Sequence, residues 1–462
     1  MYLKLPLILF GVLASFFLQA QVQHQTCVTT SRLPYEWPRN NTWFVGQFSG
    51  SLTTGAQIIT FNGGFSKTPA TQPIAVYEGV TAISDDNGDL VLLSNGKYAW
   101  DRTGAITSTD IKEGDEAGGQ DPTTAGNKQI GSASQGIISV RHPLTPNKYY
   151  IVTVGDVIGG ANPGMTYNVF DENGVETQGN TALGMKACEG IAATLHENGV
   201  DVWVSVLEYG AGNLYSYLLT CNGFDPPVIS NNGDVRTGDA GRGGLAFSHD
   251  GKQFAACFPT GWPDAAKQIS LYDFNKKTGK FLNRQNIGPT NFVLGPYDCT
   301  FSKDNSEVIV SKGNGGTVNS VNIATQVLTK DLGAIAGGSH TVQIGGDGNY
   351  YFNGNDGLWQ WSGAGNATKV DDATGWGLPT IYIPPAEEPD IEEVTSRCDT
   401  FPDFDLHTYW VCSGLSSEDT LYSRHNYYLL DSNDASGATI DPSSAAIIGQ
   451  KTGVFSPSKA GS

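Results

Sequence analysis

The chain has 462 residues, and its 46 acidic and 27 basic residues give a formal charge of −19 at pH 7. A charge of this sign repels nucleic acid and anionic membrane surfaces, so neither is expected as a partner. Hydrophobic residues make up 39% of the chain and aromatic residues 10%. This is enough for a large core, which excludes a disordered protein.

The N-terminus has the pattern of a secretory signal peptide. Lys4 precedes an apolar run over residues 5–18, and a small residue, Ala20, follows it. We predict a signal peptide over residues 1–20, cleaved after Ala20. Cys27 lies too far beyond Ala20 for a lipid anchor, and no other apolar run approaches the length of a transmembrane helix. The mature chain is therefore expected to be secreted or held at the outer cell surface, with no transmembrane segment.

One pattern recurs six times between residues 78 and 352: a start that usually contains glycine, a short apolar strand, a polar turn and a second apolar strand. Its first four copies are spaced by 57, 54 and 54 residues, as measured from Gly79, Gly136, Gly190 and Gly244. Repeats of this length built from hairpins are typical of propeller blades. Residues 375–382 look like the first strand of a further blade, whose outer strands would come from the N-terminal strand around residues 43–46. We predict an all-β, seven-bladed β-propeller, with six or eight blades as alternatives.

Composition divides the rest of the chain. Residues 21–41 lead into the propeller, which spans residues 42–383. Residues 384–393 are rich in proline and acid and form an extended linker. Residues 394–462 contain short strands at 406–412, 427–430 and 454–455, which predict a partial immunoglobulin-like β-sandwich module. Such a module needs about 100 residues, so we expect this one to be cut short and the natural polypeptide to continue.

All 7 cysteines lie beyond the signal peptide, where disulfides can form. Cys398 and Cys412 flank a short segment and are the most plausible disulfide pair, although the connectivity cannot be deduced from sequence. Cys188, Cys257 and Cys299 lie on apolar strands, which favours buried small hydrophobic side chains. The cysteines and histidines have no zinc-binding spacing.

Glu78 and Glu189 are the candidate residues for a site. They occupy matching places before the innermost strands of two blades, which would direct both carboxylates to one mouth of the central channel. A carboxylate pair there could serve acid and base chemistry or bind a cation. The alternative, which we favour, is that residues at blade starts are solvated or cap neighbouring backbone amides. No catalytic, cofactor-binding or metal residues are assigned.

Other motifs have structural explanations. The turn at residues 85–89 is rich in oxygen ligands and could hold calcium, yet a hairpin needs these residues for its turn. Residues 248–254 resemble the Asp-box turn of sialidases, in which Ser248 and Asp250 would tie a hairpin together. Trp359 and Trp361 would face the same side of a strand, as a sugar-stacking platform or, as we favour, in core packing. Lone histidines of this kind are usually structural or exposed: His142, His196, His249 and His340.

The ordered set of motifs resembles a family of large secreted Bacteroidota surface proteins, of the gliding-motility-associated or type IX secretion, type B sorting-domain kind. The resemblance covers about residues 43–382. It rests on residues 43–46, 78–90, 95–96, 100–102, 132–138, 147–154, 247–252, 301–305 and 377–379. It implies an N-terminal propeller, immunoglobulin-like or similar modules, and a C-terminal sorting domain, which is not recognisable in this chain. The family supplies no catalytic residues to carry over.

Two functions remain open. The first, which we favour, is a non-catalytic binding or structural protein, an adhesin or surface-appendage component, whose propeller loops meet an extracellular glycan or protein. The second is a propeller enzyme, a hydrolase or lyase acting on an extracellular polysaccharide or lactone. Fold alone cannot choose between them, because propellers host both kinds of function. The identity of the ligand and the oligomeric state cannot be deduced from the sequence.

Overall fold

A computed structural model describes most of the region between residues 40 and 380 and four short strands beyond residue 400. The described residues are 40–46, 56–61, 64–70, 74, 76–85, 88–111, 133–143, 148–157, 164–198, 201–258, 269–288, 296–312, 317–334, 339–354, 356–372, 375–380, 404–405, 426–429, 446–450 and 454–455.

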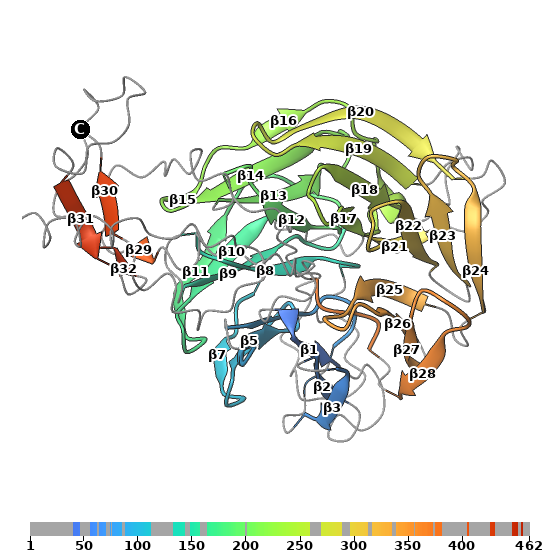
Figure 1. Cartoon of the computed structure of the whole chain (residues 1–462), viewed down its shortest axis with the longest axis horizontal. Helices are drawn as coiled ribbons and strands as arrows, with labels where there is room; N and C mark the ends of the chain where they lie inside the picture. Colours follow the sequence, from blue (N-terminus) through green and yellow to red (C-terminus); the bar gives the residue numbers. More distant parts are fainter. Residues whose placement is uncertain are drawn as a thin grey trace, which may run out of the picture.

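Seven antiparallel sheets form the blades of a β-propeller, which confirms the predicted fold class. In Figure 1 they follow one another around a common centre, from blue at the bottom through green and yellow to orange. The innermost strands of successive blades contact one another around the ring. We number as blades 1 to 6 the sheets that begin at β4, β8, β12, β17, β21 and β25, and as blade 7 the sheet β1-β2-β3.

Blades 1 to 3 and the N-terminal blade 7 cover the first half of the propeller. Blade 7 contains β1 (Thr42–Val45), β2 (Gln57–Thr60) and β3 (Ser66–Pro69). Blade 1 contains β4 (Thr81–Ser84), β5 (Leu90–Ser94), β6 (Ala99–Asp101) and β7 (Ile106–Ser108). Blade 2 contains β8 (Ile137–Arg141), β9 (Tyr149–Thr153), β10 (Thr166–Phe170) and β11 (Glu176–Ala182). Blade 3 contains β12 (Ala192–Leu195), β13 (Val202–Leu207), β14 (Leu214–Thr220), β15 (Gly223–Phe224) and β16 (Val228–Ser230).

Blades 4 to 6 follow a short 3₁₀ helix, η3 (Gly238–Gly241). Blade 4 contains β17 (Leu245–Phe247), β18 (Gln253–Cys257), β19 (Ile269–Asn275) and β20 (Lys280–Ile287). Blade 5 contains β21 (Pro296–Phe301), β22 (Glu307–Lys312), β23 (Thr317–Asn322) and β24 (Leu328–Ala334). Blade 6 contains β25 (Ser339–Ile344), β26 (Tyr350–Gly354), β27 (Gly357–Trp361) and β28 (Thr368–Asp371).

The core lies between the blades. One buried cluster joins Val140 and Val152 of blade 2 to Val204 of blade 3, and another joins Leu271 of blade 4 to Val308 of blade 5. Inner strands meet a neighbouring sheet on both faces, so β8 and β13 are buried along their whole length. Outer strands such as β11 are largely exposed. Burial on both faces explains the continuous apolar runs that marked the inner strands in the sequence.

Blade 7 differs from the prediction. Its three strands all come from the N-terminus, with β1 fully buried and β3 exposed, so β1 is the innermost strand. Residues 375–380 were expected to provide that strand, but they form no strand. They instead cross between blades, where the amides of Gly375 and Trp376 donate to the carbonyls of Gly46 (3.1 Å) and Tyr77 (2.9 Å). The N-terminal segment therefore supplies the whole blade rather than its outer strands alone.

The C-terminal region contains two small strand pairs. β29 (Phe404–Asp405) pairs with β32 (Val454–Phe455), and β30 (Asn426–Leu429) pairs with β31 (Ala446–Gln450). Two of the predicted strands are present here, at 426–429 and 454–455, while residues 406–412 lie outside the described residues. The immunoglobulin-like module stays a prediction.

The turn at Ser248 has the hydrogen bonds expected of an Asp-box. The Ser248 hydroxyl accepts from the amide of Gln253 (2.8 Å) and donates to the Asp250 carboxylate (2.6 Å). The turn at Ser302 and Asp304 repeats the arrangement, with distances of 2.9 Å and 2.7 Å. The predicted structural role of this motif is confirmed.

Replacing Ser248 by alanine should lower the free energy of unfolding by about 1–2 kcal/mol, because it leaves the half-buried amide of Gln253 without its acceptor. Chemical denaturation would measure the loss. Ser362→Ala is the control, since this exposed hydroxyl makes one 3.3 Å bond to a carbonyl. Equal stability of the two variants would contradict the structural role of the motif.

Candidate functional site

Glu78 and Glu189 lie in equivalent positions, each three residues before the innermost strand of its blade. Glu78 is 6% exposed and Glu189 is 0% exposed. The idea that such residues are solvated is therefore wrong for both. The burial directs them into the protein at one end of the inner strands, where side chains from other blades meet them.

Glu189 is held by groups of blade 2. One carboxylate oxygen accepts hydrogen bonds from the amide and the hydroxyl of Ser134, at 3.0 Å and 2.8 Å. The other accepts from the amide of Val157 at 3.2 Å. The Glu189 amide in turn donates to the carbonyl of Gly241 at 3.0 Å. Gly241 lies in the segment that precedes blade 4. Glu189 thus caps backbone amides, as expected, and ties three successive blades together.

Glu78 is held from across the ring. The phenol of Tyr297 in blade 5 donates a 2.5 Å hydrogen bond to Glu78 of blade 1. These residues are 219 positions apart in the sequence, and blades 6 and 7 lie between them in the ring. Side chains from blades so far apart in the ring can touch only where the inner strands converge. Glu78 and Tyr297 therefore lie at the hub of the propeller.

Both hub carboxyls favour the protonated form. Burial raises the pKa of Glu78 to about 8, against the opposing effects of the Tyr297 hydrogen bond and the Arg242 charge. Burial also raises the pKa of Glu189 well above its usual value, and the charge of Glu78 and a hydrogen bond with Asp156 raise it further. The two glutamates interact electrostatically, so the structure does bring together the residues that the sequence paired.

Aromatic rings complete the hub. The ring of His340 stacks on that of Trp376, with centroids 4.0 Å apart, and meets Tyr297 edge-on at 5.6 Å. Tyr77, next to Glu78, also packs against Trp376, with ring centroids 4.9 Å apart. Burial lowers the pKa of His340 to about 4, so this imidazole is neutral at physiological pH. The hub combines buried polar groups with stacked rings.

Sequence reasoning missed most of the hub. Asp156, Arg242, Tyr297 and Trp376 were not considered, and His340 was considered only as a lone histidine. One signal was available, because Tyr297 begins the fifth copy of the repeat as Glu78 begins the first. The first residue of every copy could have been expected at the hub. Asp156 and Trp376 lie in irregular segments, which no periodic pattern marks.

A further buried carboxyl links blades 5 and 6. Asp298 accepts hydrogen bonds from the amides of Cys299 at 2.8 Å and Val342 at 3.0 Å. Burial raises its pKa to about 7. Asp298 is 2% exposed, and its hydrogen bonds go to backbone amides. Its role is the same as that of Glu189, namely to hold adjacent blades together where their inner strands begin.

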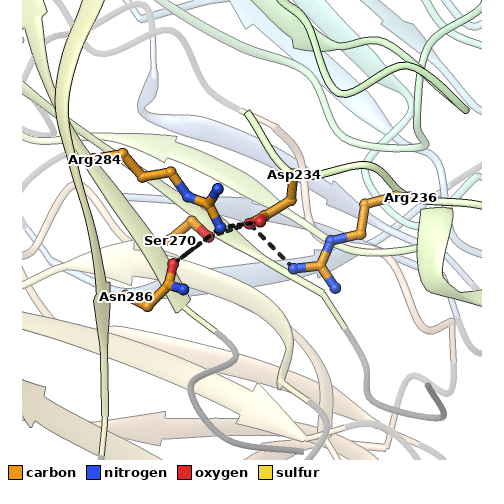
Figure 2. Close-up of polar contacts among 5 residues, drawn as sticks. All are labelled: Asp234, Arg236, Ser270, Arg284 and Asn286. Atoms are coloured by element: carbon orange, nitrogen blue, oxygen red, sulfur yellow. Dashed lines mark hydrogen bonds and ion pairs between the residues drawn. The ribbon is translucent and has the colours of Figure 1, made fainter. Parts of the chain in front are cut away.

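An ion-pair network joins blades 3 and 4 (Figure 2). Asp234 lies between Arg284 and Arg236, with Arg236 at 3.2 Å, and also accepts from the Ser270 hydroxyl. Asn286 accepts from Ser270 at 3.2 Å and from Arg284 at 3.3 Å. Asp234 is 17% exposed and the two arginines 20% and 30%, so this network lies nearer the surface than the hub.

The remaining candidates have structural positions. All four histidines considered above are buried. Trp361 belongs to a buried cluster and Trp359 packs against it, which confirms core packing rather than an open sugar platform. Asp85 accepts from the amide of Asp89 at 3.1 Å, as a turn residue does, while residues 86 and 87 lie outside the described residues. Within the described part of the chain, no three metal-ligating side chains are grouped, and calcium binding stays a prediction.

The cysteines fall into two groups. Cys188, Cys257 and Cys299 are buried thiols, as predicted. Cys221 is bonded in a disulfide, and its partner lies outside the described residues because the other three described cysteines are thiols. Cys398 and Cys412 also lie outside the described residues, so their pairing stays a prediction. Among the described residues, no helix has the length and apolar character needed to span a membrane.

Comparison with known proteins adds no family. No family model matches the chain, and no curated protein matches it. Among solved structures, a suggested 6-phosphogluconolactonase from Bacteroides uniformis is 12% identical, with a TM-score of 0.44, covering 74% of this chain and 98% of that one. The β-propeller domain of Cps50 (Swd1) from Myceliophteria thermophila is also 12% identical, with a TM-score of 0.44 and coverages of 74% and 97%. Likenesses this distant carry no information about activity.

Proposed function

We propose that this protein is a secreted or cell-surface, non-catalytic binding or structural protein, an adhesin or surface-appendage component. One observation carries the proposal: the two carboxylates best placed for catalysis are buried and bonded to protein groups. Glu189 accepts three hydrogen bonds from blade 2, and Glu78 accepts one from Tyr297. A carboxylate that reacts with a bulky extracellular substrate must contact it, and these two contact the blades.

The ligand is proposed to be an extracellular glycan or protein that meets the loops of the propeller. The predicted signal peptide supports export, and the predicted linker and C-terminal module support a role as a spacer at the cell surface. The resemblance to secreted Bacteroidota surface proteins agrees with this placement. The formal charge of −19 argues against anionic partners and favours neutral or basic ones.

A glycan array tests the proposal. The exported full-length chain should bind one class of glycan saturably, and the same polysaccharides should show no breakdown products after incubation. Running the array with calcium and with EDTA determines whether the turn at Asp85 contributes. Cleavage of a bound polysaccharide would overturn the non-catalytic assignment.

The enzyme alternative keeps one supporting observation. The pKa of Glu78 lies near 8 and the Tyr297 phenol is bonded to it, so one carboxyl at the hub exchanges its proton close to neutral pH. If a polysaccharide or lactone is turned over, Glu78→Gln and Glu189→Gln should each abolish turnover in protein that circular dichroism shows to be folded. Retained turnover in either variant would remove that glutamate from the mechanism.

A further inference from the structure

Two buried thiols face each other across the boundary between blades 4 and 5. Cys257 is the last residue of β18, and Cys299 lies within β21, the innermost strand of the next blade. Their exposures are 0% and 2%, and both belong to the same buried cluster. The sequence explained them separately, as small hydrophobic residues, because 41 residues separate them along the chain.

The carbonyl of Gly244 brings the two cysteines together. It accepts a hydrogen bond from the amide of Cys257 at 3.0 Å, and the sulfur of Cys299 lies 3.8 Å from the same oxygen. The Cys299 sulfur is also 3.9 Å from the carbonyl of Ala255, two residues before Cys257 on the same strand. Burial raises the pKa of the Cys299 thiol, and interaction with the Cys257 thiol raises it further. The two side chains are therefore neighbours within one buried cluster.

A glycine makes this approach possible. A Cβ atom on Gly244 would lie 1.9 Å from a carboxylate oxygen of Asp298, the residue before Cys299. With any larger residue at position 244, the first strand of blade 4 could not lie so close to blade 5. The close approach of Cys299 to the strand that carries Cys257 thus follows from the same packing that seats Asp298.

We propose that Cys257 and Cys299 are a disulfide site that joins blade 4 to blade 5. The reaction is exchange with a disulfide donor of the compartment into which the chain is exported. The two thiols lose two protons and two electrons and form one S–S bond. The S–S bond of the donor breaks and takes up those protons and electrons as two thiols. The inference rests on the export included in the proposed function.

Burial determines when the bond can form. In the closed propeller, a donor cannot reach sulfur atoms that are almost wholly buried, and burial raises the pKa of the Cys299 thiol well above its usual value, so thiolate is scarce. The exchange therefore belongs to folding, before blades 4 and 5 close on each other. Once formed, the bond is protected from reductants by the same burial.

The test is a peptide map of the exported full-length chain, denatured without reductant and alkylated. We expect a cross-linked pair of peptides containing Cys257 and Cys299. Cys188 serves as the internal control and should be alkylated, since it lies in a different buried cluster, between blades 3 and 4. Native protein treated with a mild reductant should keep the cross-link, while protein reduced after denaturation should lose it.

A variant separates the cross-link from simple packing. Cys257→Ser should leave Cys299 as a thiol that can be alkylated. The variant should melt at a lower temperature than the non-reduced parent protein, but at the same temperature as the reduced parent. If the parent and the variant melt alike after the parent has been reduced in denaturant and refolded, the difference belongs to the bond. An equally large difference after reduction would assign it to packing and overturn the proposal.

Alkylation of both Cys257 and Cys299 in the parent would also overturn the inference. The state of Cys221 in the same sample then tells whether the proposed export fails as well. If Cys221 is cross-linked in the same sample, export into an oxidising compartment stands and only the blade 4 to blade 5 bond fails. If Cys221 is also alkylated, the export within the proposed function fails as well. The same map reports whether Cys398 and Cys412 are paired.

Discussion

Gly243→Ala should destabilise the propeller by about 3–5 kcal/mol, a large fraction of the stability of a typical domain. Gly243 has a φ of 135°, a region that residues with a side chain rarely adopt. A Cβ atom there would lie 2.1 Å from the carbonyl oxygen of Cys257 and 3.0 Å from the Cα of Phe258. Both neighbours are backbone atoms of β18 or its end, so the sheet itself would have to move. Chemical denaturation of the two proteins measures the loss.

Gly64→Ala is the matched control for this experiment. Gly64 has nearly the same φ, 131°, but no atom lies within 4 Å of the position its Cβ would take. It should lose only the part due to backbone strain, about 1–2 kcal/mol. The difference between the two variants measures the contact between the start of blade 4 and β18. Equal losses would mean that backbone strain alone explains the effect and that blade 4 tolerates the added methyl group.

Replacing Glu78 by glutamine should flatten the pH dependence of stability. The pKa of Glu78 rises from 4.5 to about 8 on folding, so between these values the folded state holds a proton that the unfolded chain has lost. The free energy of unfolding therefore falls as pH rises through this range, by about 1.4 kcal/mol for each pH unit at most. Glutamine cannot ionise, so the variant should lose about 3–5 kcal/mol less than the parent between pH 5 and pH 8.

Denaturation midpoints at half-unit steps of pH would show this. The variant should be the more stable protein at pH 8 and no more stable at pH 5, because protonated glutamate and glutamine have similar shape and bonding capacity. Glu197→Gln removes an exposed carboxylate and controls for the loss of one negative charge from an acidic chain. A parent whose stability is level or rising between pH 5 and pH 8, with no divergence from the variant, would show that Glu78 is ionised in the fold.

Periodicity predicted the architecture because it is a local property. Each copy of the repeat folds as a hairpin whose strands and turn lie within about 20 residues, so Val80 and Leu93 mark their blade without reference to the rest of the chain. Blade 7 shows where this fails. Residues 375–382 have the glycine and apolar composition of a blade start, yet the innermost position was already filled by β1. Packing decides which of two segments becomes the innermost strand of a blade, and a sequence pattern carries no information about packing.

The hub could be predicted only in part for a similar reason. Glu78 and Glu189 were found together because they hold the same register in two copies. Their partners do not share this residue type: Tyr297 begins its copy of the repeat with a phenol instead of a carboxylate, and Trp376 lies in a crossing segment with no repeat to compare. The raised pKa of both carboxyls is also invisible in the sequence, since it depends on burial by residues of other blades.

The way the ring closes determines how it would respond to force. No β-ladder joins the two ends of the propeller among the described residues, because blade 7 pairs only with itself. Backbone bonds to Gly46, Tyr77 and Val80 hold the last propeller residues before the linker, 375–380, together with side-chain bonds from blade 6 and the stacking of Trp376. Tension applied through the C-terminal region would load these contacts first and one at a time. Further opening between blades 6 and 7 would have to expose the buried cluster that joins Trp43 and Phe61 to Tyr351.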